Sequence, residues 1–81
     1  MQVRLLLFAY YRDVAGAAEL DLDVPAGCSA LEAVAHLRAR GPSLSQIPQR
    51  PVVAVNQVYA SLDQVLEEGD EMALLPPVAG G

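Results

Sequence analysis

The chain has 81 residues, enough for one small domain, and it lacks the run of about 18 apolar residues that a membrane span needs. Hydrophobic residues make up 53% of it, more than so small a domain can bury, so part of this apolar surface should face a partner. The formal net charge of −5 argues against binding to nucleic acid, because an acidic domain repels phosphate backbones.

The first third of the sequence predicts two strands. Residues 3–11 are rich in Val, Leu, Phe and Tyr and contain no strand breaker. Arg4 interrupts this apolar run and no small-residue cleavage site follows, so we expect no signal peptide and a cytoplasmic location. Residues 12–18 predict a turn or one helical turn. Residues 19–24 alternate acidic and apolar side chains, which predicts a half-buried strand, antiparallel to the first.

A helix is predicted from residue 30 to residue 40. Ser29 and Glu32 have the spacing of a capping box, in which each side chain binds the backbone N–H of the other. Gly41 suits the left-handed position after a helix, and Pro42 prevents the helix from continuing. The helix should therefore begin at Ala30 and end close to Gly41.

The second half predicts three further strands. Residues 43–50 form a loop, and the apolar run of residues 51–56 reads as a central strand. A short strand follows at residues 58–61, and residues 62–66 could add one turn of helix. Residues 71–75 are the last predicted strand.

This order, β-β-α-β-β-β, predicts an α+β fold with a mixed sheet of about five strands and one main helix. One helix can cover only one face of a sheet. Apolar residues of the other face would then remain exposed and bind partners. We expect Phe8, Tyr59 and Leu75 to belong to this partner-binding surface.

The interior of the sequence offers no catalytic constellation. His36 falls on the polar face of the helix without a second ligand at metal-binding spacing, so no metal site is predicted. Cys28 is the single cysteine, which excludes an internal disulfide and favours a structural role. The acidic residues 67–71 predict a solvated turn, or a docking point for a basic partner.

The last six residues, Pro76-Pro77-Val78-Ala79-Gly80-Gly81, predict an extended tail after a domain formed by residues 1–75. The two prolines cannot continue the strand and favour a stiff exit. The two glycines carry no side chain, so the backbone can enter a narrow channel. Extended at about 3.3 Å per residue, the tail reaches roughly 20 Å. We therefore predict that the carboxylate of Gly81 is the functional group.

Three segments carry a resemblance to a known family. They are Val53-Ala54-Val55-Asn56-Gln57, then Gly69-Asp70-Glu71, then the tail from Pro76 to Gly81. Together they resemble the small subunit of molybdopterin synthase, the MoaD family, and residues 8–16 are similar to it too. The resemblance covers nearly the whole chain. Ala79 departs from it, because the family often has Ser or Thr there.

The resemblance implies a β-grasp, ubiquitin-like fold and a sulfur carrier. It implies that a MoeB-type enzyme uses ATP to adenylate Gly81, and that a sulfur donor then converts the carboxylate into a thiocarboxylate. The tail would deliver this sulfur inside the large subunit of the synthase, in a heterotetramer of two large and two small subunits. There, cyclic pyranopterin monophosphate would become the dithiolene of molybdopterin. No stably bound cofactor is implied, only a transient acyl-adenylate.

Two alternatives stay open on the sequence alone. The chain could carry sulfur for another pathway, such as thiazole formation in thiamine synthesis. It could instead be a ubiquitin-like protein modifier or interaction module, which would form an adduct with lysines of target proteins.

Overall fold

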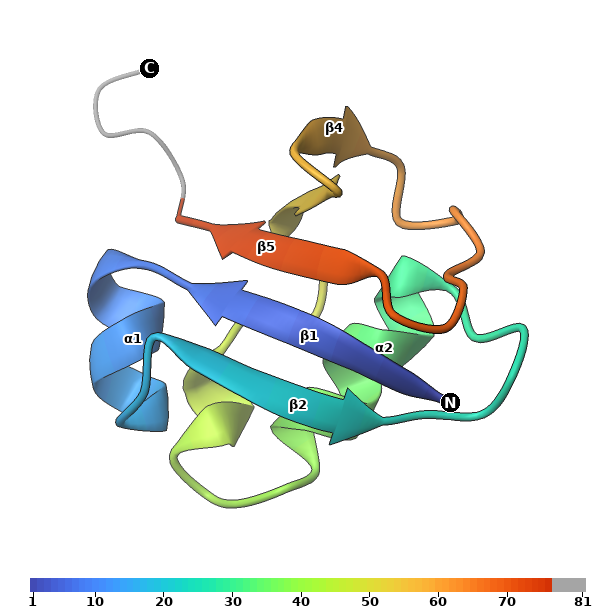
Figure 1. The fold of residues 1–81 in the computed structure, drawn as a ribbon. Coiled ribbons are helices and arrows are strands. Elements are labelled where there is room, and N and C mark those ends of the chain that lie inside the picture. Colours follow the sequence, from blue (N-terminus) through green and yellow to red (C-terminus); the bar gives the residue numbers. More distant parts are fainter. Residues whose placement is uncertain (77–81) are drawn as a thin grey trace.

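The structure, a computed structural model, describes residues 1–76 and contains one sheet and two helices. In chain order the elements are β1 (Gln2–Leu7), α1 (Ala9–Ala15), β2 (Glu19–Asp23), α2 (Ala30–Arg38), the 3-10 helix η1 (Leu44–Gln46), β3 (Val52–Val55), β4 (Val58–Ala60) and β5 (Glu71–Leu75). The strands lie in the order β2-β1-β5-β3-β4 (Figure 1). β1 and β5 are parallel, and the other neighbouring pairs are antiparallel. The sheet is mixed and five-stranded, as predicted.

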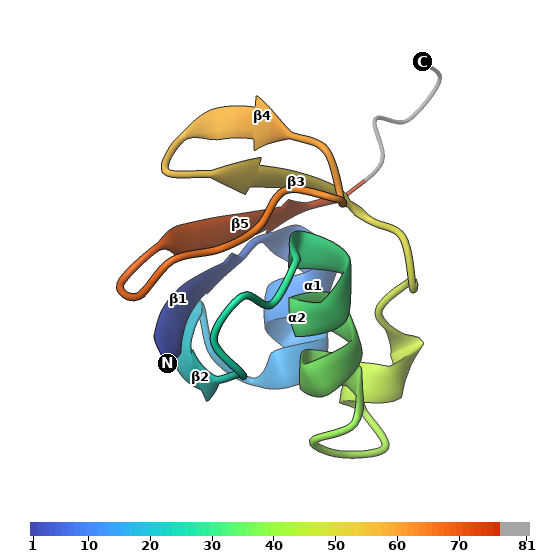
Figure 2. The ribbon, with the colours of Figure 1, turned by 90° about the vertical axis from the view of Figure 1, so that its right-hand side faces the viewer.

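Both helices cover the same face of the sheet (Figure 2). Between them and the sheet lies one core, to which β1 contributes Leu5 and Leu7, β5 contributes Met72 and Leu74, and α2 contributes Leu37; all five side chains are fully buried. Since successive strand residues point to opposite faces, the other half of each strand is left on an uncovered face. Within residues 1–76, neither helix has the length and hydropathy to cross a membrane.

The prediction of a strand over residues 3–11 was wrong beyond Leu7. β1 ends there, Phe8 is extended, and the helix α1 follows over Ala9–Ala15, where a strand was expected up to residue 11 and a turn or one helical turn over residues 12–18. The helix places the side chain of Tyr11 in the core, where Tyr11 is only 3% exposed. Gly16 ends α1 in the left-handed conformation with a φ of 73°, which glycine adopts at little cost.

The helix α2 begins at Ala30 as predicted, with both hydrogen bonds of the capping box present. The hydrogen bonds from Ser29 hold the pKa of the Glu32 carboxyl below its usual value. The predicted end was wrong: α2 ends at Arg38, and Gly41 does not take a positive φ. The guanidinium of Arg38 donates from Nε to the backbone oxygen of Ile47 at 2.7 Å, which draws the following loop back against the helix.

Residues 62–66 form turns and an isolated bridge, where one turn of helix was expected. Their backbone groups bind the start of α2: the N–H of Ala30 donates to the oxygen of Gln64, and the N–H of Leu66 to the oxygen of Cys28. Because the start of α2 already provides hydrogen-bond partners for these backbone groups, a helical turn would add no stabilising hydrogen bonds for them.

Candidate functional site

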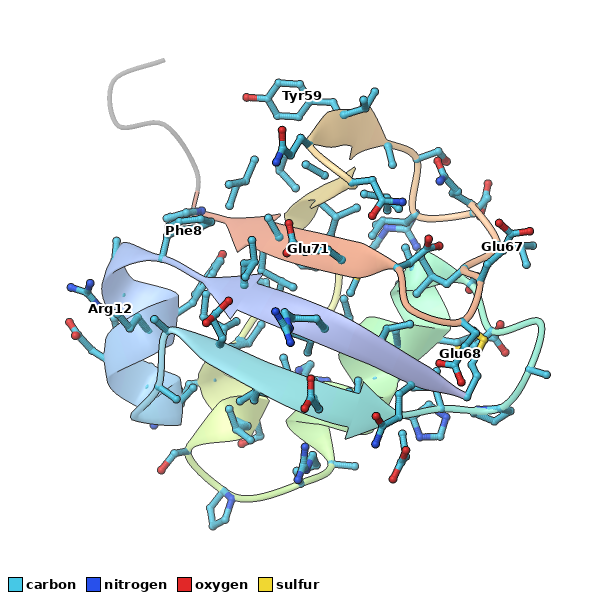
Figure 3. The ribbon with its side chains drawn as sticks, in the orientation of Figure 1. Phe8, Arg12, Tyr59, Glu67, Glu68 and Glu71 are labelled. Atoms are coloured by element: carbon cyan, nitrogen blue, oxygen red, sulfur yellow. The ribbon has the colours of Figure 1, made fainter. Side chains whose placement is uncertain are left out.

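One half of the uncovered face of the sheet is apolar. The strand pairings place Leu6, Ala73, Ala54 and Tyr59 side by side across four strands. We define the apolar half as this row together with residues at the ends of β1, β3 and β5: Phe8, Val52 and Leu75. Tyr59 is 77% exposed and Phe8 46% exposed, and Figure 3 shows Phe8 where the described chain ends. Exposed apolar side chains gathered on one face are typical of a surface that binds another protein.

The exposure predicted for the three partner-binding residues is present. Phe8 and Tyr59 are exposed, and Leu75 is half-buried on the same face. Val52, 51% exposed, was missed because the run of residues 51–56 reads as fully buried. The missing signal was the alternation of β3: Val53 and Val55 point to the helices, so Val52 must point away.

The other half of this face is acidic. The strand pairings place Arg4 between Asp21 and Glu71, and Leu6 beside Glu19. The Nε of Arg4 lies 3.8 Å from Oδ1 of Asp21, and both side chains are largely exposed, so the pair contributes little to stability. A partner covering the whole face would therefore meet an apolar half and an acidic half.

The acidic turn of residues 67–71 has a structural role at several positions. Asp70 accepts hydrogen bonds from the backbone N–H of Glu67 at 2.8 Å and from the side-chain amide of Asn56 at 3.0 Å. Glu68 accepts from the backbone N–H of Gln2 at 2.7 Å. These carboxylates join the last turn to β1 and to the β3–β4 hairpin, which fixes the start of β5. Figure 3 shows Glu68 on this turn, close to the start of β1.

The tail begins where β5 ends. Pro76 is half-buried and is the last described residue, next to Leu75 on the apolar half. Pro77, Val78, Ala79, Gly80 and Gly81 lie outside the described residues, so the roles predicted for them stay predictions. The described part does place the start of the tail at the margin of the apolar half.

Cys28 is buried at the entrance to α2, and His36 is exposed on that helix. The Cys28 thiol donates to the backbone oxygen of Ser29 at 3.3 Å. Burial, and then the nearby Glu32 carboxylate, raise the pKa of the thiol. The thiolate is the reactive form, so the structure makes Cys28 a poor nucleophile. Among residues 1–76 no three potential metal ligands gather.

If the chain carries sulfur as the resemblance implies, we expect Cys28→Ser to acquire and transfer it as the parent would, because the Cys28 thiol is buried and its raised pKa keeps it in the unreactive protonated form. A raised pKa also means that the thiol stabilises the fold below about pH 8.5 and that this contribution is lost as the pH rises further. Urea unfolding between pH 7 and pH 10 should show a smaller loss of stability in Cys28→Ser. A persulfide found on Cys28 in protein that has been loaded with sulfur would contradict the expectation that Cys28 takes no part in sulfur transfer.

Comparison with known proteins shows the family. The model of the ThiS family matches residues 5–81, so the match includes the tail. Three curated proteins named molybdopterin synthase sulfur carrier subunit align over the whole chain or nearly so. The human protein is 36% identical, over 99% of this chain and 94% of its own length. The Mycobacterium tuberculosis protein is 35% identical, over 100% and 99%. The Arabidopsis thaliana protein is 31% identical, over 100% and 84%.

The chain belongs to the ThiS family, and within it to the molybdopterin synthase sulfur carrier subunits.

Solved structures confirm the β-grasp fold. The crystal structure of SAMP1 from Haloferax volcanii is 30% identical with a TM-score of 0.84, covering all of both chains. A putative molybdopterin converting factor subunit 1 from Pyrococcus furiosus is 26% identical with a TM-score of 0.81, over 96% of this chain and 99% of that one. Members of this fold family thus superpose on nearly the whole chain.

Proposed function

We propose that this sulfur carrier subunit works through its last residue, with the carboxylate of Gly81 adenylated and then converted into a thiocarboxylate. The observation that carries the proposal is the full-length similarity to molybdopterin synthase sulfur carrier subunits, in a family match that runs to residue 81. The reaction would end with sulfur in the dithiolene of molybdopterin, formed from cyclic pyranopterin monophosphate.

Activation and sulfuration of the Gly81 carboxylate require chemical groups that partner enzymes would supply. A carboxylate is a poor electrophile until its oxygen becomes a good leaving group, as in an acyl-adenylate. A partner enzyme of the MoeB type would use ATP for this step and release pyrophosphate; a sulfur donor would then displace AMP. The resulting thiocarboxylate is a soft nucleophile, ionised at neutral pH. The chain itself contributes a tail whose last two residues have no side chain to obstruct entry into an active site.

The uncovered face supports a role as the docking surface for both partners. The activating enzyme and the large subunit of the synthase each have to receive the tail, which starts beside Leu75 and Pro76 on the apolar half. Partners that capture the same tail from the same surface would exclude one another. The large subunit would supply the catalytic side chains, and two copies of each subunit would form the complete synthase.

Reconstitution tests the function. The chain is incubated with the activating enzyme, ATP and sulfide, and then with the large subunit and cyclic pyranopterin monophosphate. We expect molybdopterin to form in proportion to the amount of charged carrier, because each carrier delivers one sulfur. Product formed without the carrier, or none formed with a fully charged carrier, would contradict the proposal.

Phe8→Glu should weaken binding to both partners at least tenfold, because the substitution puts a charge at the edge of the apolar half, where a partner would have to desolvate it. Isothermal titration calorimetry with each partner measures the effect, and circular dichroism checks the fold. The matched control is Val65→Glu, since Val65 is 58% exposed on a loop that joins β4 to β5. Equal losses in both variants, or an unfolded Phe8→Glu domain, would contradict the assignment.

A protein modifier is the second candidate. It is favoured by the similarity to SAMP1 and to a second solved structure, that of the H. volcanii small archaeal modifier protein 1. This second structure is 29% identical to the chain, with a TM-score of 0.84. The family name also leaves room for a carrier that serves thiamine synthesis. Peptide mapping of host proteins separates a modifier from a carrier: a modifier leaves a C-terminal peptide of this chain joined through Gly81 to a target lysine by an isopeptide bond, whereas a carrier is recovered with a free thiocarboxylate.

A further inference from the structure

A hollow of about 130 Å³ lies where the end of β5 meets the start of β3. It is lined by Tyr11, Pro48, Arg50, Pro51, Val52 and Leu75. We call it the Tyr11 hollow. Val52 and Leu75 lie opposite each other in the pairing of β3 with β5, and both belong to the apolar half. A partner that covers the apolar half therefore reaches this hollow as well.

Tyr11 brings to the hollow a hydroxyl group that has no hydrogen-bond partner among residues 1–76. The residue is only 3% exposed. Because no fully buried side-chain oxygen in that range lacks a partner, the Tyr11 oxygen must still reach the surface, and Tyr11 lines the surface of the hollow. Burial raises the pKa of Tyr11, so its hydroxyl is protonated at neutral pH and can donate.

Arg50 adds a second donor, and this one is charged. Its side chain is exposed, and its guanidinium makes neither a hydrogen bond nor an ion pair within the described part of the chain. Arg38, by contrast, donates to the backbone oxygens of Ile47 and Ser45. The chain has ten acidic residues, yet none of the residues that line the hollow is acidic. The lining thus offers donors and a positive charge without an acceptor for them.

These features fit a single carboxylate. Its two oxygens can accept from the Tyr11 hydroxyl and the Arg50 guanidinium together. Pro48, Pro51 and Val52 provide apolar walls for the methylene groups of a side chain. The volume of about 130 Å³ is close to the roughly 150 Å³ that holds one benzene molecule. One Asp or Glu side chain therefore fits, whereas a drug-sized ligand needs a pocket of about 300 Å³ or more.

The position of the hollow favours a carboxylate that a protein delivers over a free anion. The hollow opens at the edge of the apolar half, where Val52 is 51% exposed. A free anion bound there would stay in contact with water, and water screens its attraction to Arg50. A protein docked on the apolar half would exclude that water, which strengthens both the ion pair and the hydrogen bond.

We propose that the Tyr11 hollow binds one Asp or Glu side chain of a protein docked on the apolar half, with the Tyr11 hydroxyl and the Arg50 guanidinium as donors to its carboxylate. This proposal rests on the proposed function, because the proteins that dock there are those that receive the tail. The hollow would then select partners that carry an acidic residue at the matching position of their interface.

Isothermal titration calorimetry of the full-length chain with the activating enzyme and with the large subunit tests the hollow. We expect Tyr11→Phe and Arg50→Gln each to weaken binding to at least one of them about tenfold or more. The double variant should lose less than the product of the two single losses, because both donors act on the same carboxylate. The urea midpoint of Tyr11→Phe should equal that of the parent, since the hydroxyl has no partner within residues 1–76.

Each substitution has a matched control. Tyr10→Phe removes the neighbouring hydroxyl, which donates to Oε1 of Gln46 at 2.8 Å and does not line the hollow. Arg40→Gln removes an exposed guanidinium that donates to the backbone oxygen of Asp21 at 3.1 Å. Both controls should bind as the parent does.

Three results would overturn the proposal: unchanged affinity of Arg50→Gln for both partners, equal losses in the variants and their controls, or a Tyr11→Phe loss that a lower urea midpoint accounts for. A parent chain that binds neither partner would overturn the proposed function itself, and the hollow would lose its occupant with it. The affinity of the parent thus tests the function, and the ratios of variant to parent test the hollow.

Discussion

A chain that lacks Gly81 is expected to lose sulfur transfer by about a hundredfold or more while its fold is unchanged. The deletion moves the terminal carboxylate back by one residue, about 3.3 Å. Misplacement on the scale of 1 Å can already cost a hundredfold where the reacting atoms must meet in a near-attack geometry. Among residues 1–76 the buried apolar residues lie between Val3 and Leu74, so we expect the domain to fold without Gly81. Single-turnover formation of the thiocarboxylate measures the loss.

The companion variant appends one alanine after Gly81. The carbonyl of Gly81 then belongs to a peptide bond, which an adenylating enzyme cannot activate, so the loss should match that of the deletion. Urea unfolding of both variants is the control and should give the same midpoint as the parent. A shortened or extended chain that is charged at the parental rate would show that the position of the carboxylate is not what matters.

The second large effect is expected at Leu74, in the strand that leads to the tail. Its side chain is 0% exposed on the helix side of β5, paired with Leu7 and Val53 on the neighbouring strands. Leu74→Ala removes buried methyl groups and leaves a cavity, which typically costs about 2–5 kcal/mol. A small domain has roughly 5–15 kcal/mol in all, so this is a large share of its stability. Urea unfolding followed by circular dichroism measures the free energy.

Leu75→Ala is the matched control, one residue further along the same strand. Leu75 points to the uncovered face and is half-buried, so its truncation should cost less than about 1 kcal/mol. It should instead weaken binding to the partner proteins. The two leucines thus separate the two faces of one strand. If Leu75→Ala destabilised the domain as much as Leu74→Ala, the uncovered face would be part of the core.

Local patterns were enough to predict most of the fold. The capping box at Ser29 and Glu32 predicted the start of α2, and the alternation of residues 19–24 predicted β2. The uncovered face was predicted because a single layer of helix can cover only one side of a sheet. The exposed Phe8 and Tyr59 were predicted in this way.

The errors share a physical cause. The residues of α1 include two tyrosines and a valine, which favour a strand, yet they form a helix because the helix brings Tyr11 onto the end of the core. The contact between α2 and the loop before β3 was also missed, because neither segment carries a local signal that they meet; the guanidinium of Arg38 makes this contact by donating to the backbone oxygens of Ile47 and Ser45. Contacts between distant segments decide both cases.

The most direct test of the account is the intact mass of the protein after it has been charged. The parent chain, the Gly81 deletion and Cys28→Ser are each incubated with the activating enzyme, ATP and sulfide, and fragmentation then locates any added sulfur. We predict the mass gain of an oxygen-to-sulfur exchange at Gly81 in the parent and in Cys28→Ser, and none in the deletion. Sulfur on the deletion variant, or none on Cys28→Ser, would contradict a carrier that acts through its terminal carboxylate.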